Sequence, residues 1–158
     1  MRIGVLSDTH RKLDLARKAL KDIGKLDLLL HAGDHYQDAL TLGKEFNVPV
    51  KAVVGNCDFF SNKPSEEVLQ LGKYKLLLTH GHQYGVKRGL QNIYYRGLET
   101  GVDIIVFGHT HTPVHIIHEG MHILNPGSIG LPRGNSGPSY ALITIEPELA
   151  IVIKEIGK

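Results

Sequence analysis

Five short apolar runs divide the chain, each too brief for a helix and without the polar–apolar alternation of half-exposed strands. Runs of this kind are typical of strands that are buried on both faces of a layered sheet. We therefore predict strands at Ile3–Leu6, Leu26–Leu30, Val50–Val54, Leu76–Leu78 and Ile104–Phe107.

Apolar residues at helical spacing lie between these runs. The first such stripe ends before a stop at Gly24 and consists of Leu13, Ala16, Leu20 and Ile23. A second helix is predicted over Tyr36–Phe46. A third stripe lies before Gly101 and consists of Val86, Leu90, Ile93 and Tyr94. The order of elements at the amino-terminal end is therefore β-α-β-α-β.

The pattern changes after Pro113, where Gly- and Pro-rich turns separate short extended segments. These segments are Val114–Ile117, His122–Leu124, Tyr140–Ile145 and Ala150–Ile153, and we predict that most of them pair antiparallel. Two packed mixed sheets flanked by helices satisfy this order, in a single α/β domain that spans residues 1–158.

A polar cluster directly follows each of the five buried runs. The candidate donors in these clusters are Asp8, His10, Asp34, Asn56, Cys57, Asp58, His80, His82, His109 and His111. In an α/β sheet, ligands bind at the carboxyl ends of the strands. Asp8 and His10 are two residues apart, so in an extended segment their side chains would share a face and hold one cation. His109 and His111 have the same spacing.

Some of the polar residues also have an ordinary structural explanation. Asp8 and Asp34 could cap the helices that follow them, because Asp is a common N-cap. A lone histidine is more often hydrogen-bonded than metal-bound, and we apply that interpretation to His115, His118 and His122, which lie outside the pattern. The donors at the strand ends would crowd one rim of the sheets as unpaired polar groups, and a pair of cations explains them together.

The composition narrows the class of protein. A chain of 158 residues with 42% hydrophobic content can bury one substantial core. The net charge of +2 is not gathered into a basic block, so nucleic-acid binding has no support. Cys57 is the single cysteine and the amino terminus has no long apolar stretch, which indicates a cytoplasmic protein that does not span a membrane.

Taken in order, the motifs D-x-H, G-D, G-N-x-D, T-H-G-H and G-H-T-H resemble those of calcineurin-like metallophosphoesterases. The G-N-C-D variant and the later N-P-G-S, which is followed by Pro132 and Arg133, resemble specifically the small YfcE-like phosphodiesterases of bacteria and archaea. The resemblance spans nearly the whole chain. It implies a four-layer α/β/β/α sandwich and hydrolysis of a small phosphate ester or diester.

The resemblance also implies a set of ligands for two divalent metal ions. Asp8, His10 and His111 would hold the first ion, and Asn56, His80 and His109 the second. Asp34 would bridge both ions, whose shared hydroxide would attack phosphorus. Mn²⁺ is the first expectation for the metal, and Ni²⁺, Fe²⁺ and Zn²⁺ suit the same donors.

One residue departs from the family. Cys57 stands where relatives usually have a histidine that stabilises the transition state or protonates the leaving group. A neutral thiol is a weaker donor, so we expect Asp58 or His82 to take part of this role. The alternative is that Cys57 is a small buried filler.

Other functions compete with phosphodiester hydrolysis. A scaffold of the same fold, like the retromer subunit, is the main alternative, although such a scaffold departs from the complete ligand set. Nucleases with this metal site carry further domains, and no extended basic groove is evident here. We also expect a homodimer, whose interface could use Phe59, Phe60, Tyr94 or Tyr95, although core packing is an equally ordinary use of these aromatic residues.

Overall fold

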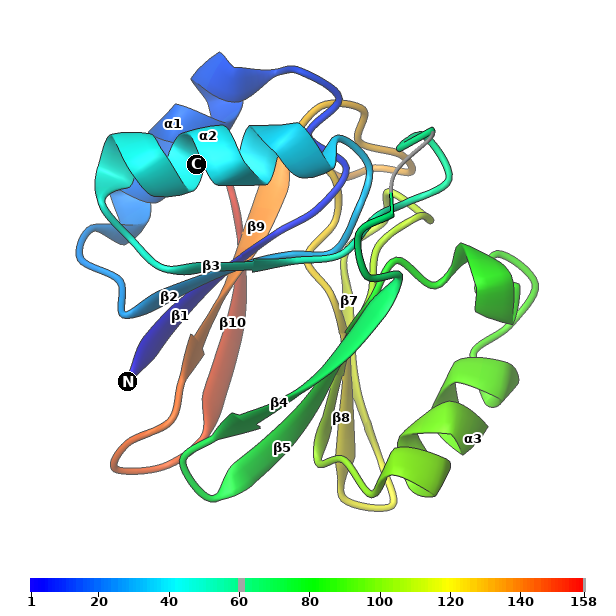
Figure 1. Ribbon diagram of the computed structural model, residues 1–158. Coiled ribbons are helices and arrows are strands. Elements are labelled where there is room, and N and C mark those ends of the chain that lie inside the picture. The colour runs from blue at the N-terminus through cyan, green and yellow to red at the C-terminus, as the bar shows by residue number, and fades with distance from the viewer. Residues whose placement is uncertain (60–61, 158) are drawn as a thin grey trace.

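The apolar runs form two five-stranded sheets that face one another in a computed structural model, which describes residues 1–59 and 62–157 (Figure 1). Helices cover the outer face of each sheet. The predicted four-layer α/β/β/α sandwich is therefore confirmed. Among the described residues, no helix is long and apolar enough to cross a membrane.

The first sheet has the strand order β10-β9-β1-β2-β3. Its strands are β1 (Arg2–Leu6), β2 (Leu28–His31), β3 (Val50–Ala52), β9 (Ser139–Thr144) and β10 (Ala150–Glu155). Strands β1, β2 and β3 are parallel, whereas β9 is antiparallel to both β1 and β10. Two helices, α1 (Leu13–Ile23) and α2 (Tyr36–Phe46), pack on its outer face.

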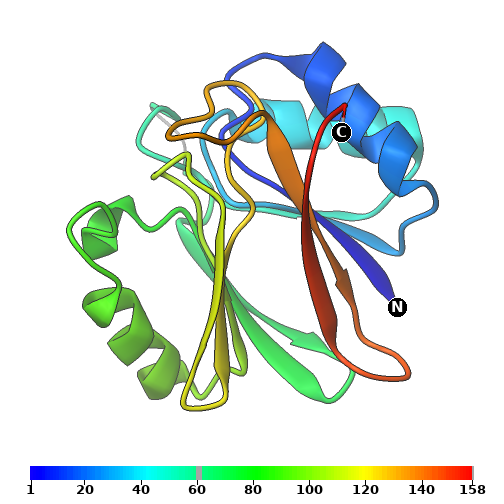
Figure 2. The same cartoon turned by 180° about the vertical axis from the view of Figure 1, so that it is seen from behind.

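The second sheet has the strand order β4-β5-β6-β8-β7. Its strands are β4 (Glu66–Leu71), β5 (Tyr74–Thr79), β6 (Ile104–Val106), β7 (Val114–His118) and β8 (Met121–Asn125). The central strands β5, β6 and β8 are parallel, and the edge strands β4 and β7 pair antiparallel with their neighbours. Helix α3 (Gln91–Thr100) covers the outer face, on the opposite side of the sandwich from α1 and α2 (Figure 2).

The main core lies between the sheets, and each sheet has a second core under its helices. In β5, Leu76 and Leu78 face the other sheet, whereas Leu77 packs under α3 with Ile93 and Ile105. Because both faces are covered, the strands read as continuous apolar runs rather than as alternating ones. This burial explains why the sequence predicted strands correctly at the five apolar runs.

Two elements differ from the sequence prediction. Strand β4 was not predicted, because it is an edge strand in which only Leu69 and Leu71 are buried. The third helix begins at Gln91 rather than near Val86, which is buried in the turn that precedes it. A short 3₁₀ turn, η1 (His82–Tyr84), and Gly85 in a left-handed conformation separate β5 from this helix.

Candidate metal centre

The loops after the parallel strands of both sheets meet at one rim of the sandwich. Strands β1, β2 and β3 are followed by Asp8 with His10, by Asp34 and by Asn56. Strands β5 and β6 of the facing sheet are followed by His80 and by the pair His109 and His111. The carboxyl ends of parallel strands share one edge, which is why residues more than 100 positions apart become neighbours: the backbone N–H of His109 donates to Asp8 Oδ2.

The backbone at these residues is not extended. Asp8, His10, Asp34, His109 and His111 all have positive φ, between 44° and 67°. The prediction that alternation along a strand places Asp8 and His10 on one face was therefore wrong; tight left-handed turns bring the two side chains together. Non-glycine residues rarely adopt this conformation, and its cost is typically tolerated at functional sites.

The helix-capping alternative is also wrong. Helix α1 has Lys12 at its N-cap and α2 has His35, and neither helix has a side-chain cap hydrogen bond. The Asp8 and Asp34 carboxylates instead lie among the histidines. Asp8 is fully buried and Asp34 is 2% exposed, so their charges require partners.

Four of the predicted ligands form one compact group. Asp8, His10, Asp34 and His111 each offer a donor atom, and these atoms all lie within 4.8 Å of one another. His111 Nδ1 lies 2.7 Å from the Leu131 carbonyl oxygen and must donate to it, so Nε2 of the neutral ring is an acceptor. That Nε2 lies 3.0 Å from Asp8 Oδ1, which is itself an acceptor without a hydrogen-bond partner in the part of the chain that the structure describes.

His80 and Asn56 repeat this arrangement on the other side of Asp34. His80 Nδ1 lies 2.7 Å from the Ala32 carbonyl oxygen, which leaves Nε2 of the neutral ring as an acceptor. This Nε2 lies 3.0 Å from Asn56 Oδ1 and 3.4 Å from Asp34 Oδ1. The His109 ring packs edge-on against His80, with centroids 5.0 Å apart.

Acceptor atoms that converge without a donor repel one another unless a cation lies between them. His10 Nε2 adds a further buried nitrogen that has no hydrogen-bond partner within residues 1–59 and 62–157, and it lies 3.6 Å from Asp34 Oδ2. Carboxylate, imidazole and amide oxygen donors together suit divalent transition metals. The residues present therefore fit a metal site.

Neighbouring groups fix the orientation of the donors. Ser7 Oγ lies 2.5 Å from Asp8 Oδ2, and the Cys57 backbone N–H donates to Asp34 Oδ1 over 2.9 Å. Carbonyl oxygens hold the tautomers of His80 and His111, as described above. Outer contacts of this kind are typical of metal sites, where they set the direction and basicity of each ligand.

The pKa shifts follow from burial and from the crowding of imidazoles and carboxylates. Burial opposes ionisation of Asp8, yet contacts with His111, His80 and Ser7 lower its pKa overall. Burial also disfavours the charged form of His111. The Asp8 carboxylate nevertheless raises the pKa of His111 overall, because it stabilises the protonated imidazole. Burial, the His80 charge and the Lys87 charge lower the pKa of His109 to about 4.

The three predicted proton donors have different surroundings. Burial, followed by Asp34, raises the pKa of the Cys57 thiol to about 11, so the thiol is neutral. Both Asp58 oxygens accept backbone N–H groups, from Tyr36 and from Gly55, each at 2.8 Å. His82 lies with its ring centroid 5.4 Å from that of His80, and its Nδ1 is buried without a partner among the described residues.

Several buried polar residues support the site although sequence reasoning did not assign them to it. Thr9 Oγ1 donates to Asp38 and lies 3.1 Å from Nε2 of the fully buried His31. Asn125 Nδ2 donates to the Gly108 carbonyl oxygen, and Ser128 Oγ donates to that of Asp8. The N-P-G-S run was the available signal, because polar residues at the end of a buried strand need partners.

The histidines outside the pattern do not join the site. His115 and His122 hydrogen-bond to each other over 3.0 Å, and His118 packs against Tyr94. Arg133 donates its backbone N–H to the His111 carbonyl oxygen, while its side chain is exposed.

Comparison with known proteins agrees with this geometry. Residues 1–148 match the model of the calcineurin-like phosphoesterase superfamily domain. The chain is 39% identical to the probable metallophosphoesterase YsnB of Bacillus subtilis over 153 residues, which cover 96% of this chain and 89% of YsnB. It is 36% identical to the phosphodiesterase YfcE of Escherichia coli over 103 residues, which cover 60% of this chain and 52% of YfcE.

Solved structures share the fold over nearly the whole chain. A predicted phosphoesterase from Streptococcus pneumoniae superimposes with a TM-score of 0.82 at 29% identity, covering 98% of this chain and 88% of that one. Vps29 of Entamoeba histolytica in complex with zinc superimposes with a TM-score of 0.76 at 21% identity, covering 99% and 100%. The family model and the identity to YsnB, with the carboxylates and imidazoles gathered at one rim, lead to one conclusion: this chain belongs to the calcineurin-like phosphoesterase superfamily.

Proposed function

We propose that this phosphoesterase hydrolyses phosphodiesters with the help of two divalent metal ions. The observation that carries the proposal is the convergence of acceptor atoms at two places, one beside Asp8 and one beside His80, with Asp34 reaching both. Asp34 Oδ2 lies 3.6 Å from His10 Nε2 and Oδ1 lies 3.4 Å from His80 Nε2. A carboxylate with one oxygen toward each group is suited to bridge two cations.

The ligands divide as the family motifs imply. Asp8, His10 and His111 would hold the first ion, Asn56, His80 and His109 the second, and Asp34 both. Mn²⁺ is the ion we expect, with Ni²⁺, Fe²⁺ and Zn²⁺ as the other candidates. When bound, the ions supply an activated water and offset the negative charge of the phosphate.

The protein orients the metal ligands and leaves the loaded site with a net positive charge. Asn56 is a neutral ligand, so only two carboxylates face two dications, and an anionic phosphate is attracted. The Ala32 and Leu131 carbonyl oxygens accept the Nδ1 protons of His80 and His111, so that Nε2 of each neutral ring is the atom available to a metal ion.

The leaving group requires a proton, and His82 is the best placed of the three candidates. Its ring centroid lies 5.4 Å from that of His80 and 6.0 Å from that of His109. Cys57 can offer only a neutral thiol. Because both Asp58 oxygens are engaged with backbone N–H groups, Asp58 would position the Asn56 loop rather than transfer a proton.

The first test is hydrolysis of bis(p-nitrophenyl) phosphate by metal-stripped protein, with and without Mn²⁺. We expect Mn²⁺-dependent turnover that Asp34→Ala reduces by at least about a thousandfold, because both ions lose a shared ligand. Mass spectrometry of the native protein and of the variant reports how many ions each retains. Two ions retained by Asp34→Ala would refute its bridging role.

The alternative is an interaction scaffold of the same fold, to which the structural similarity to Vps29 also corresponds. An enzyme would hydrolyse phosphodiesters when loaded with metal, whereas a scaffold would not. No hydrolysis with Mn²⁺, Ni²⁺ or Zn²⁺, in protein shown to bind metal, would favour the scaffold.

A homodimer also remains a prediction. Phe59 and Tyr95 are exposed, at 77% and 59%, whereas Tyr94 packs against the core under α3. Phe60 lies outside the described residues. Analytical ultracentrifugation of the wild type and of Tyr95→Ser would test whether these aromatic residues form an interface.

A further inference from the structure

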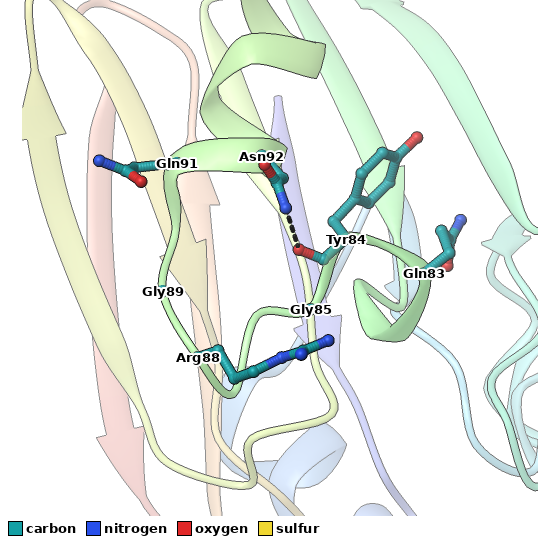
Figure 3. A pocket seen from close by; sticks show the side chains of 7 residues that line it. All are labelled: Gln83, Tyr84, Gly85, Arg88, Gly89, Gln91 and Asn92. Atoms are coloured by element: carbon teal, nitrogen blue, oxygen red, sulfur yellow. Dashed lines mark hydrogen bonds between the residues drawn. The ribbon is translucent and has the colours of Figure 1, made fainter.

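A polar pocket lies between η1 and α3 (Figure 3). It encloses about 180 Å³ and is lined by residues between Gln83 and Asn92. Its lining contains three amide side chains, Tyr84, Arg88 and two glycines, and no aliphatic side chain. A pocket of this composition is suited to a polar, negatively charged group rather than to an apolar one.

The same loop connects the pocket to the metal centre. His82 lies with its ring centroid 6.0 Å from that of His109, and the next residue, Gln83, lines the pocket. Lys87 and Arg88 follow in the same loop. The Lys87 side chain is exposed, and Arg88 lines the pocket. The loop that begins at His82 therefore carries two cationic side chains between the proposed metal ligands and α3.

The pocket is preformed by contacts that fix its loop. The Tyr84 hydroxyl donates to Glu66 of β4, and Arg96 of α3 pairs with the same carboxylate. Asn92 Nδ2 donates to the Tyr84 carbonyl oxygen over 3.3 Å, and the Arg88 backbone N–H donates to the Gly85 carbonyl oxygen over 2.8 Å. A rigid loop loses little entropy when a ligand binds.

Arg88 is the charged group of this pocket. Its side chain runs back over Gly85, where an added Cβ would lie 3.5 Å from a guanidinium nitrogen (Figure 3). Within residues 1–59 and 62–157 no carboxylate pairs with Arg88, whereas Arg17 and Arg96 each pair with two. An unpaired guanidinium presents planar donors that match the oxygens of a phosphate.

We propose that this pocket binds a second phosphate group, carried by the leaving group of the substrate. The inference rests on the proposed phosphodiesterase function and narrows its substrate class to phosphodiesters that have a further anionic phosphate beyond the scissile one. The scissile phosphate would lie at the metal ligands, and Arg88 would hold the terminal phosphate.

Alkane bisphosphonates test this arrangement without requiring turnover. One phosphonate replaces the scissile phosphate and the other reaches the pocket, and a series from ethane to octane bisphosphonate samples the separation. Calorimetry with Mn²⁺-loaded protein would compare each compound with the alkylphosphonate of equal length. We expect the best bisphosphonate to bind about tenfold more tightly, the effect of one charge-assisted contact.

Arg88→Met should remove this advantage and leave alkylphosphonate binding unchanged, while Arg88→Lys should retain part of it. Lys21→Met removes one positive charge from the last turn of α1 and serves as the matched control for net charge. Equal binding of bisphosphonate and alkylphosphonate at every length, or an advantage that survives in Arg88→Met, would overturn the proposal. Hydrolysis of bis(p-nitrophenyl) phosphate, measured in parallel, tests the proposed phosphodiesterase activity separately from the pocket.

Discussion

At the scale of single residues, the metal centre rests on buried groups that must stay in one protonation state. His31 is the clearest case, because it is fully buried and its Nε2 lies 3.1 Å from Thr9 Oγ1, which donates to Asp38. Burial lowers the pKa of His31 to about 4, although the charges of Asp8 and Asp38 oppose the shift. The native protein therefore keeps this imidazole neutral at pH values where the unfolded chain protonates it.

This difference predicts a loss of stability on acidification. The unfolded imidazole takes up a proton near its ordinary pKa of 6.5, whereas the folded one does so only near 4. The contribution of His31 is thus complete above pH 6.5 and falls as the pH decreases from 6.5 to 4. We expect a loss of about 2 kcal/mol in unfolding free energy between pH 7 and pH 5.

Urea unfolding in the presence of EDTA, at pH 7 and pH 5, measures this loss. His31→Gln should abolish that part of the pH dependence, even if the variant is less stable at both pH values. His118→Gln changes an exposed histidine and is the matched control. An unchanged pH dependence in His31→Gln would contradict the assignment.

A second prediction at this scale concerns Cys57 and the leaving group. Because its thiol is neutral and weakly acidic, it gives little help to a departing alkoxide. We expect Cys57→His to raise kcat/KM about tenfold for diesters with basic leaving groups and much less for activated aryl esters. A series of diesters graded by leaving-group pKa reads out this difference, with Cys57→Ala as the control. An equal effect across the series would identify Cys57 as a packing residue.

At the scale of elements, the site depends on how closely the strand-end loops pack. A Cβ at Gly108, after β6, would lie 2.0 Å from Ser7 Oγ and 2.7 Å from Asp8 Oδ2, across the two sheets. No side chain fits there unless the loop of Asp8 moves. Glycine at this position therefore allows the ligand loops of the two sheets to approach each other.

Gly108→Ala should for this reason displace a metal ligand as well as destabilise the fold. We expect Mn²⁺ affinity to fall at least about tenfold and the unfolding free energy to fall by about 1–3 kcal/mol. Gly120→Ala places a methyl group in open space at the β7–β8 turn, where φ is 82°, so it carries backbone strain alone. Calorimetric titration with Mn²⁺ compares the two variants, and equal affinities would show that the loops can move apart freely.

At the scale of the whole molecule, the proposed metal ligands come from both halves of the sandwich. Asp8, His10, Asp34 and Asn56 follow strands of the first sheet, and His80, His109 and His111 follow strands of the second. Metal bound by both sets would connect the two sheets at one end, in addition to the apolar core between them. The unfolded chain cannot bring these loops together, so binding would stabilise the folded state.

Metal removal should therefore lower the thermal stability of the entire domain. With free Mn²⁺ at a hundred times its Kd, the stabilisation is about 2.7 kcal/mol for one site. Differential scanning calorimetry with Mn²⁺ and with EDTA should show a single transition whose Tm rises with metal concentration. The Asp34→Ala variant should show no such rise; a Tm of the native protein that is independent of Mn²⁺ would contradict a centre shared by both sheets.

The sequence by itself determined the layers of the molecule and the chemistry of its rim. Continuous apolar runs such as Leu76–Leu78 identified the strands because both faces are buried, and the polar residues after each run identified the ligand loops. The edge strand Glu66–Leu71 lacked that signal, since it has little buried apolar surface.

Tertiary structure alone decided how the donors meet. Sequence spacing suggested that Asp8 and His10 share the face of an extended segment, whereas left-handed turns and contacts across the two sheets bring them together. The partners of Asp58, the burial of His31 and the pocket around Arg88 likewise depend on segments that are distant along the chain. Local periodicity records which face of an element is buried, but it does not record which side chain from another element completes a site.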